Sequence, residues 1–401
     1  MSGSGDSGVL GYELRGRGPA QVRLLEWLSE RVPDCELDIA VAQRSPAGPW
    51  AFKLHAPNRV PTCAALLQAE SWVERVAVRP QHVYVRVGCE RLCEWVAEGF
   101  ADGAAAARVV GGAEGRGRSV LVRAVDVDAL VAAGVPRPLR MFRETAVARS
   151  VAALLRSRGF EVGLDLLAPG RETYDDVWAA APGSVTHTVV VGSGVPLPSE
   201  LERGDHVVHL PVGEVDVRHG PLRARNGGSV SADDVVAEVA AVSGSEDEAA
   251  AYGEAVLALL LLATPRGRRI QLDDAAVRRE TETFACLATP GSAGESGSDG
   301  GGEVGPAAGS GVEESRSLAA ELDLIATNAA RAATALDPAL LARSLRSIGE
   351  RREQVAASAV GLSGRRLQRV ATPAIEVTLG LAGIGVWGAG VASERRVRAG
   401  T

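Results

Sequence analysis

The sequence predicts a mixed fold that is α/β through the first two thirds of the chain and all-α in the last third. Short apolar runs of strand type alternate with helical patterns as far as about residue 250. The last eighty or so residues instead carry two marked helix starts and no strand pattern. A segment rich in Gly, Ser and acidic residues, at about 287–312, is expected to be a disordered linker.

The N-terminal elements predict a small α+β domain over residues 1–105. Apolar spacing predicts an amphipathic helix at residues 22–31. Alternating Val residues predict strands at 73–78 and 83–87, and a second helix is expected at 90–98.

The centre of the chain predicts a small α/β layer with parallel strands. A helix is expected at residues 144–158, where Gly159 ends it. Strands are expected before and after this helix, at residues 119–125, 161–167, 186–191 and 206–211. Because strand, helix and strand follow one another, these strands are expected to pair in parallel.

Capping residues mark the helix starts of the last third. Ser231, followed by Asp234 three residues later, is typical of a capping box. Asp337-Pro338 predicts a helix start, because Asp can cap free N–H groups and Pro fits the first turn, and Thr372-Pro373 predicts another. The apolar stripes expected to face the core are Leu341, Leu345, Ile348 and Val355, then Ile375, Leu379 and Ala382.

Charge is distributed unevenly along the chain, whose formal net charge is −7. Residues 231–314 hold 16 acidic residues and 5 Arg, whereas residues 317–401 hold 11 Arg and 7 acidic residues. The basic balance of the last segment is compatible with contacts to a phosphate backbone. Lys53 is the only lysine, so any motif that requires catalytic lysines is incomplete.

Metal, disulfide and membrane functions are not expected. Five cysteines argue against a disulfide framework, and Cys89 and Cys93 lack the second pair that a zinc site needs, so core packing is expected for them. The apolar stretch 371–392 contains Glu376 and five glycines, which favours a buried helix over a membrane span. The polar Gly/Ser start is not expected to act as a signal peptide, and a cytoplasmic location is expected.

Three segments carry a family pattern. The run from Leu336 to Leu345 and the late helix ending in Leu381-Ala-Gly-Ile-Gly-Val resemble the helical, DALR-type anticodon-binding domain of arginyl-tRNA synthetases. Residues 48–54, 73–78 and 83–87 resemble the additional N-terminal domain of that family, which touches the tRNA elbow. Residues 136–139 and 145–162 are similar to the start of its catalytic Rossmann layer.

The same resemblance shows where the reaction centre of the family is not matched. In place of the family's His-x-Gly-His this chain has Pro138-Leu-Arg-Met-Phe-Arg, and in place of Lys-Met-Ser-Lys-Ser it has Pro221-Leu-Arg-Ala-Arg-Asn-Gly-Gly. Only about twenty residues stand between Val162 and Val185, where the family carries a long insertion and the amino-acid pocket. The expected remnants of the ATP site are Arg140, Arg143, Arg223 and Arg225.

The resemblance therefore implies a degenerate, non-catalytic paralogue of this class I synthetase that binds tRNA, with arginine tRNA as the expected ligand. The implied domains are the additional domain at 1–105, a contracted Rossmann-like core at 106–248 and a helical anticodon-binding domain at 249–401. No catalytic residue, cofactor or metal is expected, and a protein of translation or tRNA-dependent metabolism is a compatible partner. The expected phosphate contacts are Arg343, Arg346, Arg351, Arg352, Arg365, Arg366, Arg395 and Arg396.

Two other functions stay open. The chain could be an active arginine–tRNA ligase in which the four remnant arginines bind the ATP phosphates in place of the lost motifs. It could also be a protein-interaction scaffold that no longer binds RNA. For any single arginine of the last segment, a solvated helix face with pairing to Glu350 or Glu353 is an alternative to RNA contact.

Overall fold

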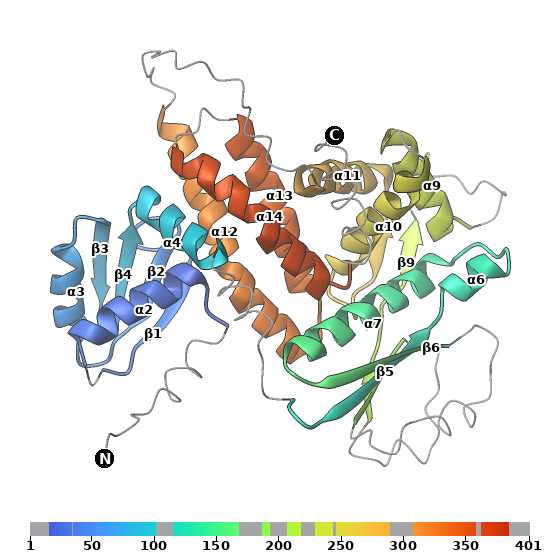
Figure 1. Cartoon of the computed structure of the whole chain (residues 1–401), viewed down its shortest axis with the longest axis horizontal. Coiled ribbons are helices and arrows are strands. Elements are labelled where there is room, and N and C mark those ends of the chain that lie inside the picture. Colours follow the sequence, from blue (N-terminus) through green and yellow to red (C-terminus); the bar gives the residue numbers. More distant parts are fainter. Residues whose placement is uncertain are drawn as a thin grey trace. The chain divides into compact units, whose positions relative to one another are not determined.

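The computed structural model of the chain describes residues 16–33, 35–101, 115–167, 187–192, 207–217, 229–243, 246–288, 308–357 and 362–384. The chain divides into two compact units. Unit 1 comprises Met1–Val109, Thr289–Ala330 and Ser347–Ala374, and unit 2 comprises Val110–Ala288, Arg331–Arg346 and Ile375–Thr401. The expected fold class is confirmed, with an α+β N-terminal part, a parallel sheet and a helical C-terminal region (Figure 1).

Unit 1 contains an antiparallel four-stranded sheet in the order β1-β2-β4-β3. Its strands are β1 (Asp38–Ala42), β2 (Ala51–His55), β3 (Val73–Arg79) and β4 (His82–Val87). The two strands expected from alternating Val residues are confirmed as β3 and β4. Alternation also separates two faces, because Phe52, Leu54 and Val83 are buried whereas their neighbours Lys53 and Tyr84 are partly exposed.

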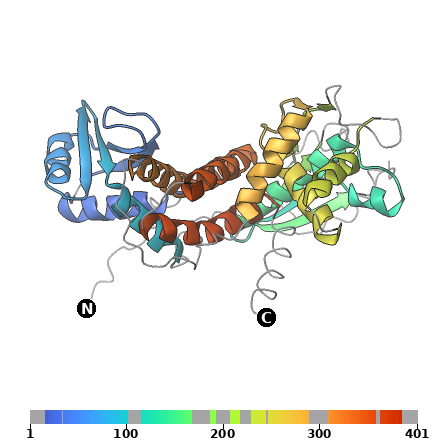
Figure 2. The same ribbon diagram turned by 90° about the horizontal axis from the view of Figure 1, so that it is seen from above.

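Three helices accompany this sheet: α2 (Pro19–Arg31), α3 (Val60–Gln68) and α4 (Cys89–Ala101). In Figures 1 and 2 they form one blue to cyan body with the strands. The expected helices at 22–31 and 90–98 are confirmed, although α2 begins three residues earlier, at a Pro in its first turn.

Asp323 joins the N-terminal part of unit 1 to the long helix α12 (Ala308–Ala335). Its side chain is fully buried, and Oδ1 accepts the backbone N–H of Ala20 at 2.7 Å while Oδ2 accepts Nε2 of Gln21 at 3.0 Å. The start of α2 has no capping side chain of its own, so a carboxylate some three hundred residues away supplies the cap.

Unit 2 is built on a parallel four-stranded sheet in the order β6-β5-β7-β8. The strands are β5 (Ser119–Val125), β6 (Glu161–Leu167), β7 (His187–Val191) and β8 (Val207–Leu210), as the sequence predicts to within one residue. Helix α7 (Leu139–Ser157) joins β5 to β6 and lies across the sheet in Figure 1. It begins five residues earlier than expected, directly after Pro138, whose extended backbone allows no earlier helical turn.

The remaining elements of unit 2 are mainly helical. They are α6 (Asp128–Ala132), β9 (Val215–Val217), α9 (Ala232–Ser243), α10 (Glu246–Leu262), β10 (Ile270–Leu272) and α11 (Asp274–Ala288). Helices α9, α10 and α11 pack on one another, and α10 also packs on α7. Strands β9 and β10 form a short parallel pair.

Helices α12, α13 (Ala339–Ala357) and α14 (Leu362–Leu381) each contribute residues to both units. Their expected stripes are confirmed, since Leu341, Leu345, Ile348 and Val355 are completely buried. Ile375, Leu379 and Ala382 are buried as well.

Two of the three expected helix starts are confirmed. Oγ of Ser231 accepts the backbone N–H of Asp234 at 3.1 Å, and the Asp234 carboxylate accepts the N–H of Ser231 at 2.9 Å. Oδ1 of Asp337 accepts the N–H of Ala339 at 3.1 Å.

The helix start expected at Thr372-Pro373 is wrong, because Pro373 lies inside α14. A proline there removes one helical N–H donor. The flanking side chains outweigh that loss, since Ala371, Ala374 and Ile375 are all buried. Burial of these side chains therefore keeps residues 371–375 helical, although proline prefers the first turn of a helix.

Helices extend into both ends of the expected linker at 287–312, because α11 runs through Ala288 and α12 begins at Ala308. The rest of that segment lies outside the described residues. Among the helices of the described ranges, none combines the length and the apolar character needed to cross a membrane.

Candidate functional site

The strand order of the parallel sheet in unit 2 identifies one candidate ligand site, the crevice at the point where doubly wound sheets bind their ligands. Chain order runs from β5 to β6 on one side and then to β7 on the other side of β5, so the topology switches between β5 and β7. Ligands of such sheets bind at the carboxyl ends of the two strands that flank the switch. Here those ends are Val125 and Val191, and the start of α7 lies beside them because Oγ1 of Thr145 donates to the carbonyl of Val125 at 2.8 Å.

A carboxylate occupies this crevice. Glu144, in the second turn of α7, is buried, with 5% of its surface exposed. Gly192 follows β7 with a φ of 132°, and a Cβ at this position would lie 3.1 Å from Cδ of Glu144. The glycine therefore leaves room for the carboxylate, and the strand end and the start of α7 meet around a negative charge.

Arg140 neutralises this charge. Its Nε donates to Oε1 of Glu144 at 3.3 Å, and its Nη1 donates to Oε1 of Glu214 at 2.7 Å. One remnant of the expected ATP site is thus held between two carboxylates. The start of a helix usually attracts anions, but a phosphate at this one would meet Glu144 and would compete with two carboxylates for Arg140.

Arg143, the second remnant, is completely buried and binds backbone carbonyls. Its Nη1 donates to the carbonyls of Gly213 at 2.8 Å and Arg268 at 2.7 Å. Its Nη2 donates to those of Thr264 at 3.3 Å and Pro265 at 3.1 Å. Burial lowers the pKa of the guanidinium to about 10, still well above neutrality, so the side chain stays charged while it ties two loops to α7.

Arg137, just before α7, completes this internal network. Nε donates to Oδ1 of Asp233 at 2.7 Å and Nη1 donates to Oε1 of Glu254 at 2.6 Å. Burial tends to lower the pKa of Arg137, but the two carboxylates outweigh it and raise the pKa. The described part of the crevice therefore does not fit a triphosphate, because each of its cationic side chains binds within the protein.

Helix α13 carries four of the expected phosphate contacts, and their surroundings differ. In unit 2, Arg343 is exposed and its Nε donates to the carbonyl of Ala339 in its own helix at 3.1 Å. Arg346 is partly exposed and pairs with Glu280 of α11, whose side chain is 1% exposed.

In unit 1, Arg351 is partly exposed and donates to Oε1 of Gln354 at 2.8 Å. Arg352 is buried, and its Nη2 donates to Oγ1 of Thr372 at 3.3 Å. Of the four side chains, Arg343 and Arg351 are thus the accessible ones whose described hydrogen bonds stay within α13.

Arg223, Arg225, Arg395 and Arg396 lie outside the described residues. Arg365 and Arg366 lie on α14, but their side chains are not described. They remain predictions from the sequence.

The open face of the N-terminal sheet brings cationic and ring side chains together. Lys53 pairs with Tyr84 across β2 and β4, His55 pairs with His82, and His82 pairs with Arg79 on β3. Directly paired residues of neighbouring strands point to the same face of a sheet. These five side chains therefore lie together on one face. Arg86 on the same face is held by Glu74 at 3.1 Å and by Glu313 at 2.5 Å.

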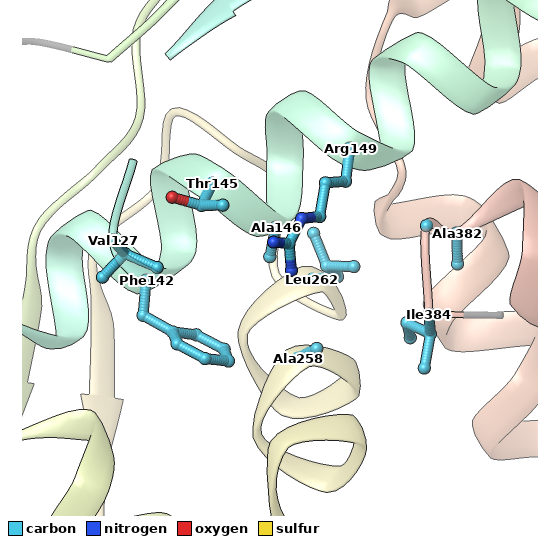
Figure 3. A pocket seen from close by; sticks show the side chains of 10 residues that line it. Val127, Phe142, Thr145, Ala146, Arg149, Ala258, Leu262, Ala382 and Ile384 are labelled. Atoms are coloured by element: carbon cyan, nitrogen blue, oxygen red, sulfur yellow. The ribbon is translucent and has the colours of Figure 1, made fainter. Parts of the chain in front are cut away.

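The apolar pocket of unit 2 is a packing defect between helices. Thr145, Ala146 and Arg149 of α7 face Ala258 and Leu262 of α10, with Ala382 and Ile384 at the end of the described chain (Figure 3). The space admits only water-sized groups. Arg149 donates to Asp128 at 2.6 Å, so this pocket offers no binding site for a nucleotide.

Sequence reasoning missed Glu144 as the residue that fills the crevice. Arg140 and Glu144 are four residues apart, which is typical of an ion pair on a helix. This spacing does not reveal that the Glu144 side chain is buried. Within the described ranges, no group of three or more His, Cys, Asp or Glu side chains could hold a metal ion.

Comparisons with known proteins identify the fold. No protein-family model and no curated protein matches the sequence. The structure is similar to arginyl-tRNA synthetase from Thermus thermophilus, with a TM-score of 0.51 and 12% identity over 91% of this chain and 98% of that chain. It is also similar to the enzyme from Plasmodium falciparum, with a TM-score of 0.50 and 7% identity over 93% of this chain and 98% of that chain. The chain thus has an arginyl-tRNA synthetase-like fold.

Proposed function

We propose that this chain is a non-catalytic tRNA-binding protein with the fold of an arginyl-tRNA synthetase. Its C-terminal helices would act as a DALR-type anticodon-binding domain, and arginine tRNA is the expected ligand. The protein would hold the tRNA by position alone and present it to a partner, such as another protein of translation or tRNA-dependent metabolism.

The occupied crevice of unit 2 is the observation that supports the loss of catalysis. Amino-acid activation needs a site that accepts the ATP phosphates, usually with cations and N–H donors. Here a buried Glu144 stands at the switch point, Arg140 is shared by two carboxylates, and Arg143 binds four carbonyls. Freeing Arg143 for a phosphate would take this donor from four backbone carbonyls, which costs about 1–3 kcal/mol for each buried group left unsatisfied.

Accessible arginines on α13 support binding of a phosphate backbone. Arg343 is exposed, Arg351 is partly exposed, and the hydrogen bonds described for both stay within α13. Each such contact releases counterions and adds to the salt dependence of binding. We give Arg346 and Arg352 a smaller part, because the former pairs with buried Glu280 and the latter is itself buried.

The N-terminal sheet offers a second contact. Lys53 and Arg79 lie on the open face with the rings of His55, His82 and Tyr84. Phosphates can bind the cations and unstacked bases can stack on the rings. In the family that the sequence resembles, the additional domain touches the tRNA elbow, and we expect the same role here. Arg86 would contribute less, since two glutamates already bind it.

Arginine-dependent pyrophosphate exchange tests the proposal against an active ligase. The full chain is incubated with ATP, arginine, labelled pyrophosphate and arginine tRNA, beside a complete arginyl-tRNA synthetase as positive control. We expect no exchange above a reaction without arginine, because the described crevice does not fit a triphosphate. Pyrophosphate exchange that depends on added arginine would contradict the proposal and would favour an active arginine–tRNA ligase.

A further inference from the structure

Two thiols meet at the start of α4. Cys89 is the first residue of this helix and Cys93 lies one turn later, and their Sγ atoms are 3.9 Å apart. Cys93 is buried, with 1% of its surface exposed, whereas Cys89 is partly exposed. One thiol is thus open to a reagent from solution, and the other lies in contact with it.

The surroundings favour a thiolate at Cys89. A hydrogen bond from Cys93 and the Arg316 guanidinium lower the pKa of the Cys89 thiol. Burial and the carboxylates of Glu313 and Glu74 oppose this shift, but the net change is a lower pKa. The position at a helix start acts in the same direction. The same hydrogen bond, together with burial, raises the pKa of Cys93.

Both thiols also join α4 to α12 within unit 1. Sγ of Cys89 contacts the carbonyl oxygen of Val312 at 3.1 Å, and Sγ of Cys93 contacts that of Ser315 at 3.9 Å. Next to them, the buried Arg316 of α12 binds Glu74 and the carbonyl of Val87. The dithiol therefore lies where the N-terminal part of unit 1 packs on the long helix.

We propose that Cys89 and Cys93 form a thiol–disulfide exchange site, in which Cys89 attacks a low-molecular-weight disulfide and Cys93 resolves the product. Cys89 thiolate attacks one sulfur of the oxidant and expels a thiolate, leaving a mixed disulfide. The Cys93 thiol then loses its proton to solvent and attacks Sγ of Cys89, and this expels the second thiolate. The net change is two protein thiols oxidised to one disulfide and one small disulfide reduced to two thiols.

The disulfide would alter the start of α4. Residues four apart on a helix have Cβ atoms roughly 5–6 Å apart, whereas a disulfide holds them at roughly 3.5–4.5 Å. Cys89 must therefore shift out of the first turn, which is possible at a helix end where the N–H groups have no helical partner. Because the sulfur of Cys89 moves, the contacts of Cys89 with Val312 and of Cys93 with Ser315 change in the oxidised form, and the packing of α4 on residues 311–316 is expected to loosen.

Oxidised glutathione and a non-reducing tryptic digest test this site directly. Arg91 lies between the two cysteines, so trypsin separates them into peptides 87–91 and 92–108. After oxidation we expect the two peptides to appear as one disulfide-linked species that reduction separates. We also expect faster amide hydrogen exchange at residues 311–316 in the oxidised protein than in the reduced protein.

Single-cysteine variants test the order of the steps. In C93S we expect a stable glutathione adduct on peptide 87–91, formed at least about tenfold faster than on Cys35, whose pKa burial raises. In C89S, no adduct should form on Cys93. C35S serves as the matched control and should form the linked peptides like the unchanged chain. Absence of the linked peptides, or faster modification of Cys35 than of Cys89, would overturn the proposal.

Discussion

The arginines at the start of α7 and those on α13 are the same residue type on two helices, yet the protein uses them differently. Arg143 is completely buried and donates to four backbone carbonyls, and Arg140 lies between Glu144 and Glu214. Arg343, in contrast, is exposed and bonds only within its own helix in the contacts described above. The difference indicates that an arginine can keep its charge while that charge serves folding, so the accessible arginines are the better candidates for RNA contact.

Removal of Arg143 should have the largest effect on stability. R143A leaves the carbonyls of Gly213, Thr264, Pro265 and Arg268 without their donor and opens a cavity, so we expect a loss of about 3 kcal/mol in the free energy of unfolding. Urea unfolding followed by circular dichroism measures this. R343A is the matched control and should change stability by less than about 0.5 kcal/mol, as surface substitutions usually do. Equal losses in both variants would break the distinction between the two sets of arginines.

A pH-dependent effect should arise at Glu321 of α12, which faces α13 in unit 1. Burial raises the pKa of this carboxyl, although a hydrogen bond from Ser347 and the nearby Arg351 oppose the shift. A folded-state pKa above the unfolded value means that stability is fully present below the unfolded pKa and is lost as pH rises through the folded pKa.

E321Q should therefore unfold at higher urea concentration than the unchanged chain at pH 7, and the gain should vanish at about pH 3, where the glutamate is protonated in both states. Gln keeps an oxygen that can accept the Ser347 hydroxyl. A gain that is the same at both pH values would show that the titration of Glu321 is not its cause.

Much of the architecture could be predicted because it depends on local patterns. Alternating Val residues predicted β3 and β4, and Ser231 and Asp337 predicted two helix starts through their capping geometry. The helix start predicted at Thr372-Pro373 was wrong, because burial of the surrounding apolar side chains outweighs the preference of proline for the first turn of a helix.

The candidate site was less predictable, since it depends on contacts between distant residues. Nothing local in the sequence indicates that Arg143 reaches carbonyls about 70 and 120 residues away, or that Glu144 meets Gly192. Likewise, Arg346 and Arg352 share a helix with Arg343, but only the fold reveals that one pairs with buried Glu280 and the other is buried.

The most direct test of the account is the binding of the full chain to arginine tRNA and to an unrelated tRNA across a salt titration. We expect tighter binding of arginine tRNA, and a double variant R343A/R351A should reduce the slope of log K against log salt by roughly 1.5, since each lost phosphate contact removes about 0.7–0.9. The control R278A/R279A removes two exposed charges from α11 and should leave the slope nearly unchanged. Indifference of the chain to both RNAs, or equal slopes in all three proteins, would contradict the account and favour a protein-interaction scaffold.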